Sequence, residues 1–506
     1  MSYARTLLAA IAIAVPLGAQ DATTAAVVRD LDTYVPKALA EWKGAGIAVG
    51  IVKDDQLVYA KGFGVREVGK PGLVDDKTLF AIGSNTKFFT AVAAAMLADE
   101  GKLSLDDRIT KHIPGFSLYD PWVTREFTVR DAMSHRSGLG RRGDPLWYGT
   151  GLSRDEIVRR VRLLPPNSSF RTEYGYQNIM FITAGQVLAA ASGMPWDDLI
   201  DRRIFKPLGM TASNTSVRAL RGQANVAAPH AFADARGAVP IAYREIDNAA
   251  AAGSINSNVQ DMATWMRFIL NGGAWNGATL LKPRTLQDIT GPHSIPTRIV
   301  NDTMGLGRHF QLYALGIGVS DLLGVKVLQH TGGIDGMLSF VAMVPERRLG
   351  VVVLTNTSPH NGLYTALGNK ILVDLLGGPK RDWSAQVLAE TNVAEQAAAK
   401  RLGDRIAARV PNTQPSRPLA EYAGTYRHEM YGDVTVAVEN GALRVRYPEG
   451  LNARVSHFHY DTFNGRGDSS LLAGDMTWVR FELDAQAKVS GVSIEDLAEF
   501  ARVKTP

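Results

Sequence analysis

Hydrophobic and polar positions alternate with two different periods along the first part of the chain. Residues 25–42 have apolar positions at helical spacing, whereas the apolar run at 47–52 is typical of a buried strand and residues 57–60 of its antiparallel return. A second helix is predicted to begin at or beside Ser84, because the apolar residues that follow it recur at i, i+3 and i+4. These residues are Phe89, Val92, Ala93, Met96 and Leu97.

The middle of the chain is predicted to contain mainly helices and loops, and strands return only after it. Prolines interrupt this section, and amphipathic stretches at 179–191 and 259–270 predict two of its helices. Early and late strands around a helical middle predict an α/β domain in which both ends contribute to one sheet. The later strands and a final helix are expected near 325–329, 337–344, 350–354 and 363–376.

Turn and linker signals divide the remainder of the chain. Residues 385–408 are alanine-rich and charged, as in a connecting helix, and prolines punctuate residues 411–418. Beyond them, apolar and polar residues alternate around an Asn-Gly pair that predicts a hairpin turn. We therefore expect a main domain at 21–380, a helical and proline-rich linker at 381–418 and an all-β barrel domain at 419–506.

The composition is that of a globular protein. Of 506 residues, 45% are hydrophobic and 21% are charged, which is enough apolar material for a large core. The chain has 55 lysine and arginine residues and 50 aspartate and glutamate residues, which gives a net charge of +5. The basic residues are spread along the chain. Such a spread is typical of a solvated surface, so we expect no nucleic-acid partner.

Residues 1–20 have the pattern of a secretory signal peptide. Arg5 precedes an apolar stretch from Leu7 to Val15, and Ala19 or Gln20 fits a cleavage site. This stretch is shorter than the ~20 apolar residues that a membrane-spanning helix needs. No later segment is long and apolar enough, and the chain has no cysteine for a lipid anchor. We expect a periplasmic or secreted protein without stable membrane insertion.

The sequence Gly83-Ser84-Asn85-Thr86-Lys87 lies at the predicted helix start and carries candidate chemistry. Residues at i and i+3 share one helix face, so the Lys87 amine can reach the Ser84 hydroxyl. A neutral lysine can take the proton of a serine, and a helix N-terminus offers N–H groups to an oxyanion. By itself Ser-x-x-Lys is a weak signal, because a capping serine beside a solvated lysine has the same pattern.

Two further segments strengthen this signal. Tyr176 and Asn178 directly precede a predicted helix, and they offer a phenol for proton transfer and a carboxamide for orienting lysine or substrate. Residues 330–333, His-Thr-Gly-Gly, follow a predicted strand, where exposed backbone N–H groups could complete an oxyanion site.

Three motifs, in this order, resemble those of the serine β-lactamase and penicillin-binding family: Ser84-x-x-Lys87, Tyr176-x-Asn178 and His330-x-Gly332. The resemblance covers roughly residues 25–376 and points to the branch with class C β-lactamases, D-stereospecific aminopeptidases, DD-peptidases and related esterases. It implies an α/β fold with an antiparallel sheet flanked by helices and an all-helical subdomain. It also implies chemistry without a metal or organic cofactor.

The resemblance implies a role for each motif residue. Ser84 would be the acylated nucleophile, with Lys87 and Tyr176 as the proton-transfer pair. Which of the two is the base in each half-reaction stays open, because coupled groups titrate as a pair. The N–H groups of Ser84 and Gly333 would form the oxyanion hole. The residues expected to bind substrate or the oxyanion are Asn178, Thr331, Gly332 and Gly333.

His330 departs from the pattern of β-lactamases, which carry a lysine in the Lys-Thr-Gly motif that contacts the substrate carboxylate. A histidine is a weaker and pH-dependent cation, so the fixed charge that favours penicillin carboxylates is missing. The departure resembles peptidase members of the branch, and we include His330 among the candidate catalytic residues. The alternative is a histidine packed under the site.

The other histidines have simpler interpretations. His135 is expected to brace a loop. His457 and His459 are expected to share one face of a strand, with no further ligand to complete a metal site. We therefore expect no metal.

The segment that begins at Leu419 and includes Gly424 and Tyr426 resembles the lipocalin-like β-barrel appended to many members of this branch. Such a barrel could stabilise the protein, gate the mouth of the active site, capture ligand or mediate homo-oligomer formation. Stabilisation is the simplest of these interpretations.

The combined expectation is a secreted serine hydrolase that cleaves an amide bond of small peptides through a Ser84 acyl-enzyme. A carboxylesterase acting on acyl esters, or a β-lactamase, is the alternative that uses the same site. The alternative from another class is a non-catalytic sensor that binds penicillin or peptidoglycan fragments. The sensor is disfavoured because a pure binder needs no apparatus for deacylation.

Overall fold

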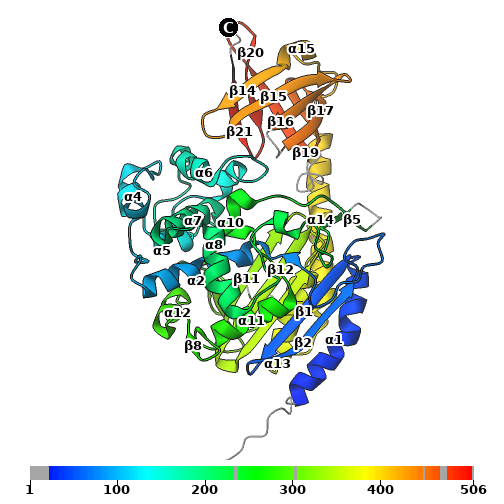
Figure 1. Ribbon diagram of the computed structural model, residues 1–506. Coiled ribbons are helices and arrows are strands. Elements are labelled where there is room, and N and C mark those ends of the chain that lie inside the picture. Colours follow the sequence, from blue (N-terminus) through cyan, green and yellow to red (C-terminus); the bar gives the residue numbers. More distant parts are fainter. Residues whose placement is uncertain are drawn as a thin grey trace, which may run out of the picture.

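The computed structural model describes residues 22–232, 237–300, 302, 305–359, 361–447, 451–467 and 476–503. The predicted signal segment at 1–20 lies outside these residues. The described part forms a larger domain built on a central sheet and a small β-barrel, which one long helix joins (Figure 1).

The central sheet has seven antiparallel strands in the order β2-β1-β13-β12-β11-β10-β9. Early and late parts of the domain therefore meet at the β1–β13 pair, which confirms the prediction of one sheet formed from both ends. The strands are β1 (Gly46–Lys53), β2 (Gln56–Gly64), β9 (Gln311–Tyr313), β10 (Gly318–Leu322), β11 (Val325–Ile334), β12 (Met337–Val344) and β13 (Leu349–Thr355).

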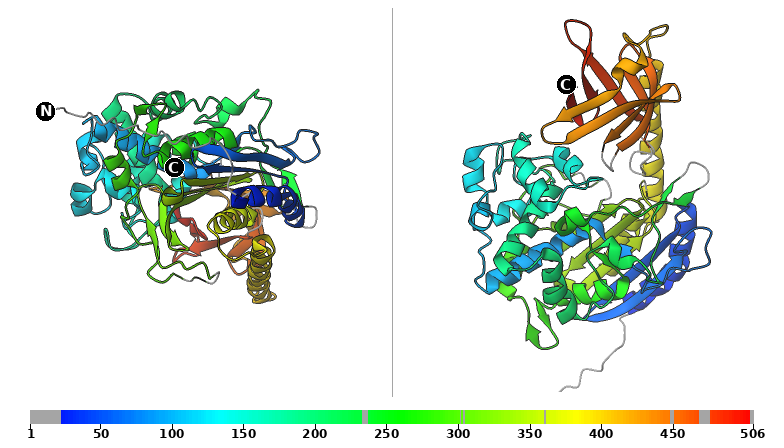
Figure 2. Two further views of the ribbon diagram at one scale, coloured as in Figure 1. Left: turned by 90° about the horizontal axis from the view of Figure 1, so that it is seen from below. Right: turned by 45° about the horizontal axis from the view of Figure 1, so that its top comes forward.

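Both faces of this sheet are buried, and β1 shows how one apolar run fills two cores. Ile47 and Ile51 belong to the core under α1 and α13, whereas Ala48 and Val52 belong to the core on the opposite face, next to α11. Side chains alternate between the faces of a strand, so a continuous apolar run serves both layers. Figure 2 shows helices on both sides of the sheet. The covering helices are α1 (Ala22–Glu41), α13 (Leu363–Leu375) and α11 (Val259–Leu270).

The helical subdomain packs around α2 and α7, which contact each other. Both helices are apolar on nearly every side and are buried accordingly. No single helix among the described residues is long and apolar enough to cross a membrane; α7 with the bent α8–α9 segment passes by length and composition only. The helices here are α2 (Thr86–Asp99), α3 (Ile109–His112), α4 (Pro121–Glu126), α5 (Val129–Met133), α6 (Arg154–Arg160), α7 (Asn178–Ser192), α8 (Trp196–Ile200), α9 (Lys206–Leu208), α10 (Ala250–Gly253) and α12 (Pro283–Ile289).

The C-terminal domain is a closed barrel of eight strands, which follows α14 (Trp383–Ala407) and the short α15 (Leu419–Tyr422). It lies over the helical subdomain (Figure 1). Two hydrogen bonds of 3.0 Å join the two parts, from the Tyr447 hydroxyl to the Pro145 carbonyl and from Arg160 to the Met430 carbonyl. The strands are β14 (Gly424–His428), β15 (Gly432–Glu439), β16 (Ala442–Tyr447), β17 (Leu451–His459), β18 (Thr462–Arg466), β19 (Met476–Leu483), β20 (Val489–Ile494) and β21 (Ala498–Arg502).

The α/β class, the antiparallel sheet with its helical subdomain and the C-terminal barrel are confirmed. Two details differ from the sequence-based prediction. β11 continues to Ile334 and pairs with β12, so residues 330–333 lie inside a strand rather than after its end. The edge strand β9 and its neighbour β10 are absent from the sequence-based prediction, because β9 has only three residues and Ser320 and Asp321 interrupt the apolar pattern of β10.

Candidate active site

Ser84 lies in a 3-10 turn, Gly83–Asn85, between the short strand β3 (Phe80–Ala81) and α2. Because α2 begins directly after this turn, the predicted helix start beside Ser84 is confirmed. Ser84 Oγ lies 2.9 Å from Lys87 Nζ and 2.7 Å from the hydroxyl oxygen of Tyr176. The hydroxyl is therefore held between an amine and a phenol.

The Lys87 side chain is completely buried, which is rare for a lysine. Its Nζ lies 2.9 Å from Ser84 Oγ, 2.7 Å from Asn178 Oδ1 and 2.8 Å from the Ala252 carbonyl oxygen. Burial lowers the pKa of Lys87 well below the ordinary lysine value, and the nearby Asp144 carboxylate opposes this shift only in part. The site therefore favours the neutral amine.

Tyr176 reaches Ser84 from the segment that precedes α7. Its hydroxyl donates a hydrogen bond of 2.7 Å to Ser84 Oγ, and Lys87 Nζ lies 4.9 Å from the centroid of its ring. Burial raises the pKa of Tyr176, and neither the Ser84 hydrogen bond nor the charge of Arg141 cancels this effect. The phenol is thus protonated in the resting site.

Asn178 connects the buried amine to the helical subdomain. Its Oδ1 accepts a hydrogen bond from Lys87, and its Nδ2 donates to Asp144 Oδ1 at 3.1 Å. The same carboxylate oxygen accepts from the Trp147 indole N–H at 2.8 Å. Sequence reasoning did not select Asp144, because nothing in its loop marks a side chain that faces α7. Only the fold brings the two segments together.

β11 approaches the Ser84 turn so closely that two glycines are required. A Cβ on Gly332 would lie 1.9 Å from the Ile82 carbonyl oxygen, and a Cβ on Gly83 would lie 2.6 Å from the Gly333 nitrogen. Gly83 also has φ of +51°, which favours glycine. The Gly333 nitrogen therefore lies against the turn that carries Ser84, and its role in an oxyanion hole stays a prediction.

Both ring nitrogens of His330 are engaged. Nδ1 lies 2.5 Å from the Thr331 carbonyl oxygen, and Nε2 lies 2.9 Å from the Tyr313 hydroxyl. A carbonyl can only accept, so we assign the proton to Nδ1 and an accepting role to Nε2. Burial is the main cause that lowers the pKa of His330, and it favours the neutral ring. His330 is half-buried and lines the same cleft as Ser84, so its catalytic role and the alternative of a histidine packed under the site both stay predictions.

His135 braces the segment that carries Tyr176. Its backbone has φ of +58°, which is uncommon for a residue with a Cβ. Its carbonyl accepts from the Gly175 N–H at 2.7 Å, and its Nδ1 accepts from the Gln177 N–H at 3.0 Å. The buried imidazole packs on the Tyr176 ring with centroids 4.3 Å apart. The loop-bracing role predicted for His135 therefore extends to the orientation of Tyr176.

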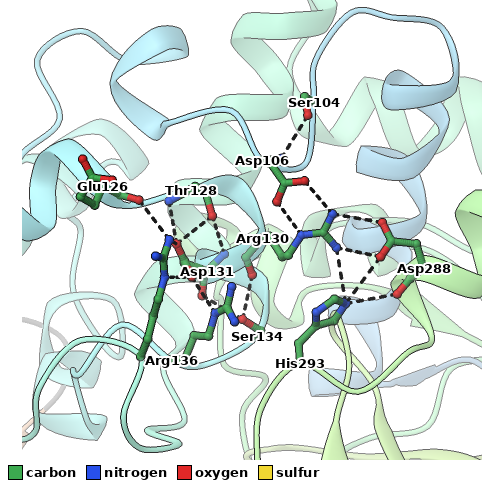
Figure 3. A network of polar contacts seen from close by, with 11 residues as sticks. Ser104, Asp106, Glu126, Thr128, Arg130, Asp131, Ser134, Arg136, Asp288 and His293 are labelled. Atoms are coloured by element: carbon green, nitrogen blue, oxygen red, sulfur yellow. Dashed lines mark hydrogen bonds and ion pairs between the residues drawn. The ribbon is translucent and has the colours of Figure 1, made fainter.

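A buried carboxylate, Asp131 of α5, anchors the loop of His135 (Figure 3). It accepts hydrogen bonds from Arg136 Nε at 2.6 Å, from Arg171 Nη2 at 2.7 Å and from the Thr128 hydroxyl at 2.7 Å. Burial by itself raises the pKa of Asp131, but the bonds from Arg171 and Thr128 and the charge of Arg136 outweigh it and lower the pKa. The loop therefore depends on an ionised carboxylate.

The site opens into a cleft of about 1950 Å³ that the larger domain, α14 and the barrel enclose together. Thr331 lines this cleft, and its side chain hydrogen-bonds to Tyr364 of α13. On the far side, Arg405 of α14 stacks on Trp478 of β19, with its Cζ 3.7 Å from the ring centroid, and pairs with Glu495 at 2.6 Å. The barrel is thus one wall of the cleft.

Within the described residues, no group of three or more histidine, cysteine, aspartate or glutamate side chains could hold a metal ion. The two histidines of β17 make local contacts instead. His457 Nε2 lies 2.9 Å from the Tyr460 carbonyl oxygen, and His459 Nδ1 accepts from the Val410 N–H at 3.3 Å.

The structure brings Ser84, Lys87, Tyr176 and Asn178 into direct contact, with Gly333 beside them, while their chemical roles stay predictions. Comparison with known proteins adds a family. The model of the beta-lactamase family matches residues 31–373, and the model described as a domain of unknown function (DUF3471) matches residues 408–504.

Single relatives agree with the family match. An unguisins hydrolase from Aspergillus violaceofuscus is 29% identical over 454 residues, which cover 81% of this chain and 76% of that protein. The octameric penicillin-binding protein homologue from Pyrococcus abyssi superposes with a TM-score of 0.61 at 22% identity, covering 94% of this chain and 99% of that one.

A D-stereospecific amidohydrolase from Streptomyces superposes with a TM-score of 0.52 at 22% identity, covering 67% of this chain and 95% of that one. At these identities the two solved structures show a common fold. The family model spans the whole sheet region that carries the Ser84 turn. The chain therefore belongs to the beta-lactamase family of serine hydrolases.

Proposed function

We propose that the chain is an exported serine hydrolase that cleaves amide bonds of short peptides through an acyl-enzyme on Ser84. The observation that carries this proposal is the set of contacts around the Lys87 amine. Nζ lies 2.9 Å from Ser84 Oγ, 2.7 Å from Asn178 Oδ1 and 2.8 Å from the Ala252 carbonyl oxygen. Two of these three partners can only accept hydrogen bonds.

A neutral amine has two N–H bonds and one lone pair. Asn178 and Ala252 take the two N–H bonds, so the lone pair is left for the Ser84 hydroxyl. The lowered pKa of Lys87 favours this neutral form. Lys87 is therefore the base that takes the Ser84 proton as Oγ attacks the substrate carbonyl, an assignment that the sequence leaves open.

Tyr176 supplies the proton for the leaving group. In the resting site the phenol donates to Ser84 Oγ, and its raised pKa keeps it protonated. When Oγ bonds to the carbonyl carbon, the C–N bond breaks and the leaving amine takes the Tyr176 proton, which the Lys87 ammonium then replaces. Water hydrolyses the ester on Ser84 by the same transfers in reverse and releases the acid.

The oxyanion of each tetrahedral intermediate is assigned to the N–H groups of Ser84 and Gly333. The close approach of β11, which the glycines at 83 and 332 permit, supports this assignment. Fixed backbone donors stabilise such an oxyanion without reorganising during the reaction.

The cleft and the neutral His330 support peptides over β-lactams. The volume of about 1950 Å³ accommodates several residues of a peptide, and the walls include aromatic side chains such as Tyr148, Tyr174 and Trp478. A neutral His330 supplies no fixed charge for a penicillin carboxylate. Two of the relatives are a hydrolase and an amidohydrolase, which agrees with an amide substrate. Carboxylesterase activity at the same site is the alternative.

Export rests on the sequence pattern of residues 1–20, and we propose a periplasmic or secreted location on that basis. Self-association through the barrel also stays a prediction, and the octameric Pyrococcus abyssi homologue adds support to it. Light scattering on the purified protein tests the second point.

A substrate panel tests the proposed function. The purified chain and Ser84→Ala are assayed on short peptides of L- and D-residues, on p-nitrophenyl esters and on nitrocefin. We expect peptide hydrolysis that falls at least about a thousandfold in Ser84→Ala. Turnover of esters alone would show that the enzyme is a carboxylesterase and not a peptidase. Turnover of nitrocefin alone would show that it is a β-lactamase. Stable labelling by a β-lactam without any turnover would favour the sensor.

A further inference from the structure

The cleft beside Ser84 contains a cation that the acyl-transfer steps do not use. Lys87 favours its neutral form and His330 is neutral, so neither presents a positive charge to a substrate. Arg141, at the start of the 3-10 segment Arg141–Leu146, lines the same cleft, and 68% of its side chain is exposed. An arginine stays charged at any pH at which the protein is folded.

The guanidinium of Arg141 lies over the ring of Tyr176. Its Cζ lies 4.6 Å from the centroid of the Tyr176 ring, which is the geometry of a cation–π contact. The nearby Asp144 Oδ2 is 3.8 Å away, beyond hydrogen-bond distance. The other oxygen of that carboxylate accepts from Asn178 and Trp147. A cation–π contact does not occupy the N–H donors of a guanidinium, so those of Arg141 can bind a planar acceptor that enters the cleft.

Asp335, directly after β11, is an acidic residue that could repel a bound anion, but its carboxylate is paired. Asp335 accepts hydrogen bonds from the Tyr148 hydroxyl at 2.7 Å and from Arg244 Nε at 3.2 Å, and its side chain is 1% exposed. Its negative charge is therefore compensated within the wall of the cleft.

We propose that Arg141 forms a binding subsite for a carboxylate group of the substrate. The inference rests on the proposed hydrolase function and narrows its substrates to peptides or esters that carry a carboxylate near the scissile bond. A guanidinium edge matches a carboxylate with two parallel hydrogen bonds. The subsite lies on the wall of Tyr176 and Asn178, not on β11, where the missing lysine of a Lys-Thr-Gly motif would stand.

Two pairs of chromogenic esters test this subsite. The first pair is p-nitrophenyl hydrogen succinate and its methyl ester, which differ in charge on the acyl side. The second pair is 4-acetoxy-3-nitrobenzoate and its methyl ester, which differ in the charge of the nitrophenol leaving group. The readout is the ratio of kcat/KM for the acid to kcat/KM for the methyl ester, which cancels differences in intrinsic reactivity between enzyme variants.

We expect this ratio to fall at least about tenfold in Arg141→Gln for one of the two pairs, because a charge-assisted hydrogen bond is lost. Arg141→Lys should restore part of the ratio, since it keeps the charge but not the planar fork. Arg401→Gln removes the same unit charge from the α14 wall of the cleft and is the matched control.

An unchanged ratio in Arg141→Gln for both pairs would overturn the subsite. An equal fall in Arg401→Gln would also overturn it, because the preference would then come from the general field of the cleft. Failure of the hydrolase proposal looks different. In that case Ser84→Ala would leave the rates of all four esters unchanged, whatever their ratios.

Discussion

The hydroxyl of Tyr176 donates a hydrogen bond of 2.7 Å to Ser84 Oγ. Because burial raises the pKa of Tyr176, the phenol is protonated in the resting site, and we propose that it enters acylation as a proton donor. Lys87, whose pKa burial lowers, has the complementary property. Burial thus lowers the pKa of the amine and raises the pKa of the phenol. This difference supports separate roles for Lys87 as base and Tyr176 as proton donor.

Replacing Tyr176 by phenylalanine tests the donor role. We expect kcat/KM for an amide substrate, which reports the steps up to acylation, to fall by about 10²–10⁴, the usual contribution of a general acid. The kcat/KM of a p-nitrophenyl ester should fall much less, because nitrophenolate leaves without a proton. Tyr174→Phe is the control, since Tyr174 lines the same cleft and is also a tyrosine of raised pKa. Equal losses for amide and ester in Tyr176→Phe would contradict the assignment.

The acid limb of the pH–rate profile tests Lys87 as the base. Activity requires the neutral amine, so kcat/KM should rise with pH through an ionisation well below the ordinary lysine value of about 10.4. Asn178→Asp combined with Asp144→Asn would put a carboxylate in place of the amide oxygen that lies 2.7 Å from Nζ, and the second change avoids two carboxylates in contact. A negative charge there favours the ammonium, so the limb should move to higher pH.

Asn178→Ala removes the amide oxygen and adds no charge. It should lower activity without moving the limb to higher pH. A limb that stays in the same place in Asn178→Asp with Asp144→Asn would show that another group controls the profile.

His135 offers a test of how the phenol is oriented. His135→Ala leaves the Gln177 N–H without its acceptor, so we expect a loss of about 1–3 kcal/mol in the free energy of unfolding. It also removes the ring that packs on Tyr176 at 4.3 Å, so kcat should fall more than KM changes.

Asparagine tolerates positive φ and carries an acceptor oxygen, so His135→Asn should recover part of both losses. His309→Ala, at an exposed histidine, is the control. If kcat remains at the parent value in His135→Ala while stability falls, His135 has no part in orienting Tyr176.

The Asp131 cluster predicts a pH-dependent stability. Asp131→Asn leaves two arginines facing a neutral amide in a buried place, and we expect a loss of about 3–5 kcal/mol in the free energy of unfolding at pH 7. The folded pKa of Asp131 is lowered, so its contribution is complete above the unfolded pKa of about 3.9 and is lost as pH falls through the folded pKa.

Urea unfolding at pH 7, 5 and 3.5 measures this difference, which should shrink only toward the lowest pH. Asp198→Asn is the control, because the side chain of Asp198 is 54% exposed and its ion pair is long at 3.9 Å. A difference that is the same at every pH would exclude ionisation of Asp131 as the cause.

Local sequence patterns account for the parts of this structure that a single segment determines. The apolar run at 47–52 predicts β1, and the helical spacing after Ser84 predicts α2, because one strand or one helix must bury those residues whatever surrounds them. The order of the three motifs predicts which residues meet at Ser84.

Relationships between distant segments were not accessible in this way. Asp144 contacts Asn178, and Arg141 stacks on Tyr176, only because the loop before α6 folds back onto the start of α7. The contacts of the two His330 nitrogens with the Tyr313 hydroxyl and the Thr331 carbonyl are likewise visible only in the fold. Side-chain orientation of this kind depends on tertiary contacts that leave no period in the sequence.

The central claim is that the substrate becomes covalently attached to Ser84. Acid quenching during steady-state turnover of a short peptide or ester, followed by proteolysis and mass spectrometry, measures this directly. The acyl group should appear on the peptide that contains Ser84, and it should be absent in Ser84→Ala, which should also lose turnover. An acyl group on another residue, or Ser84→Ala turning over at the parent rate, would contradict the account.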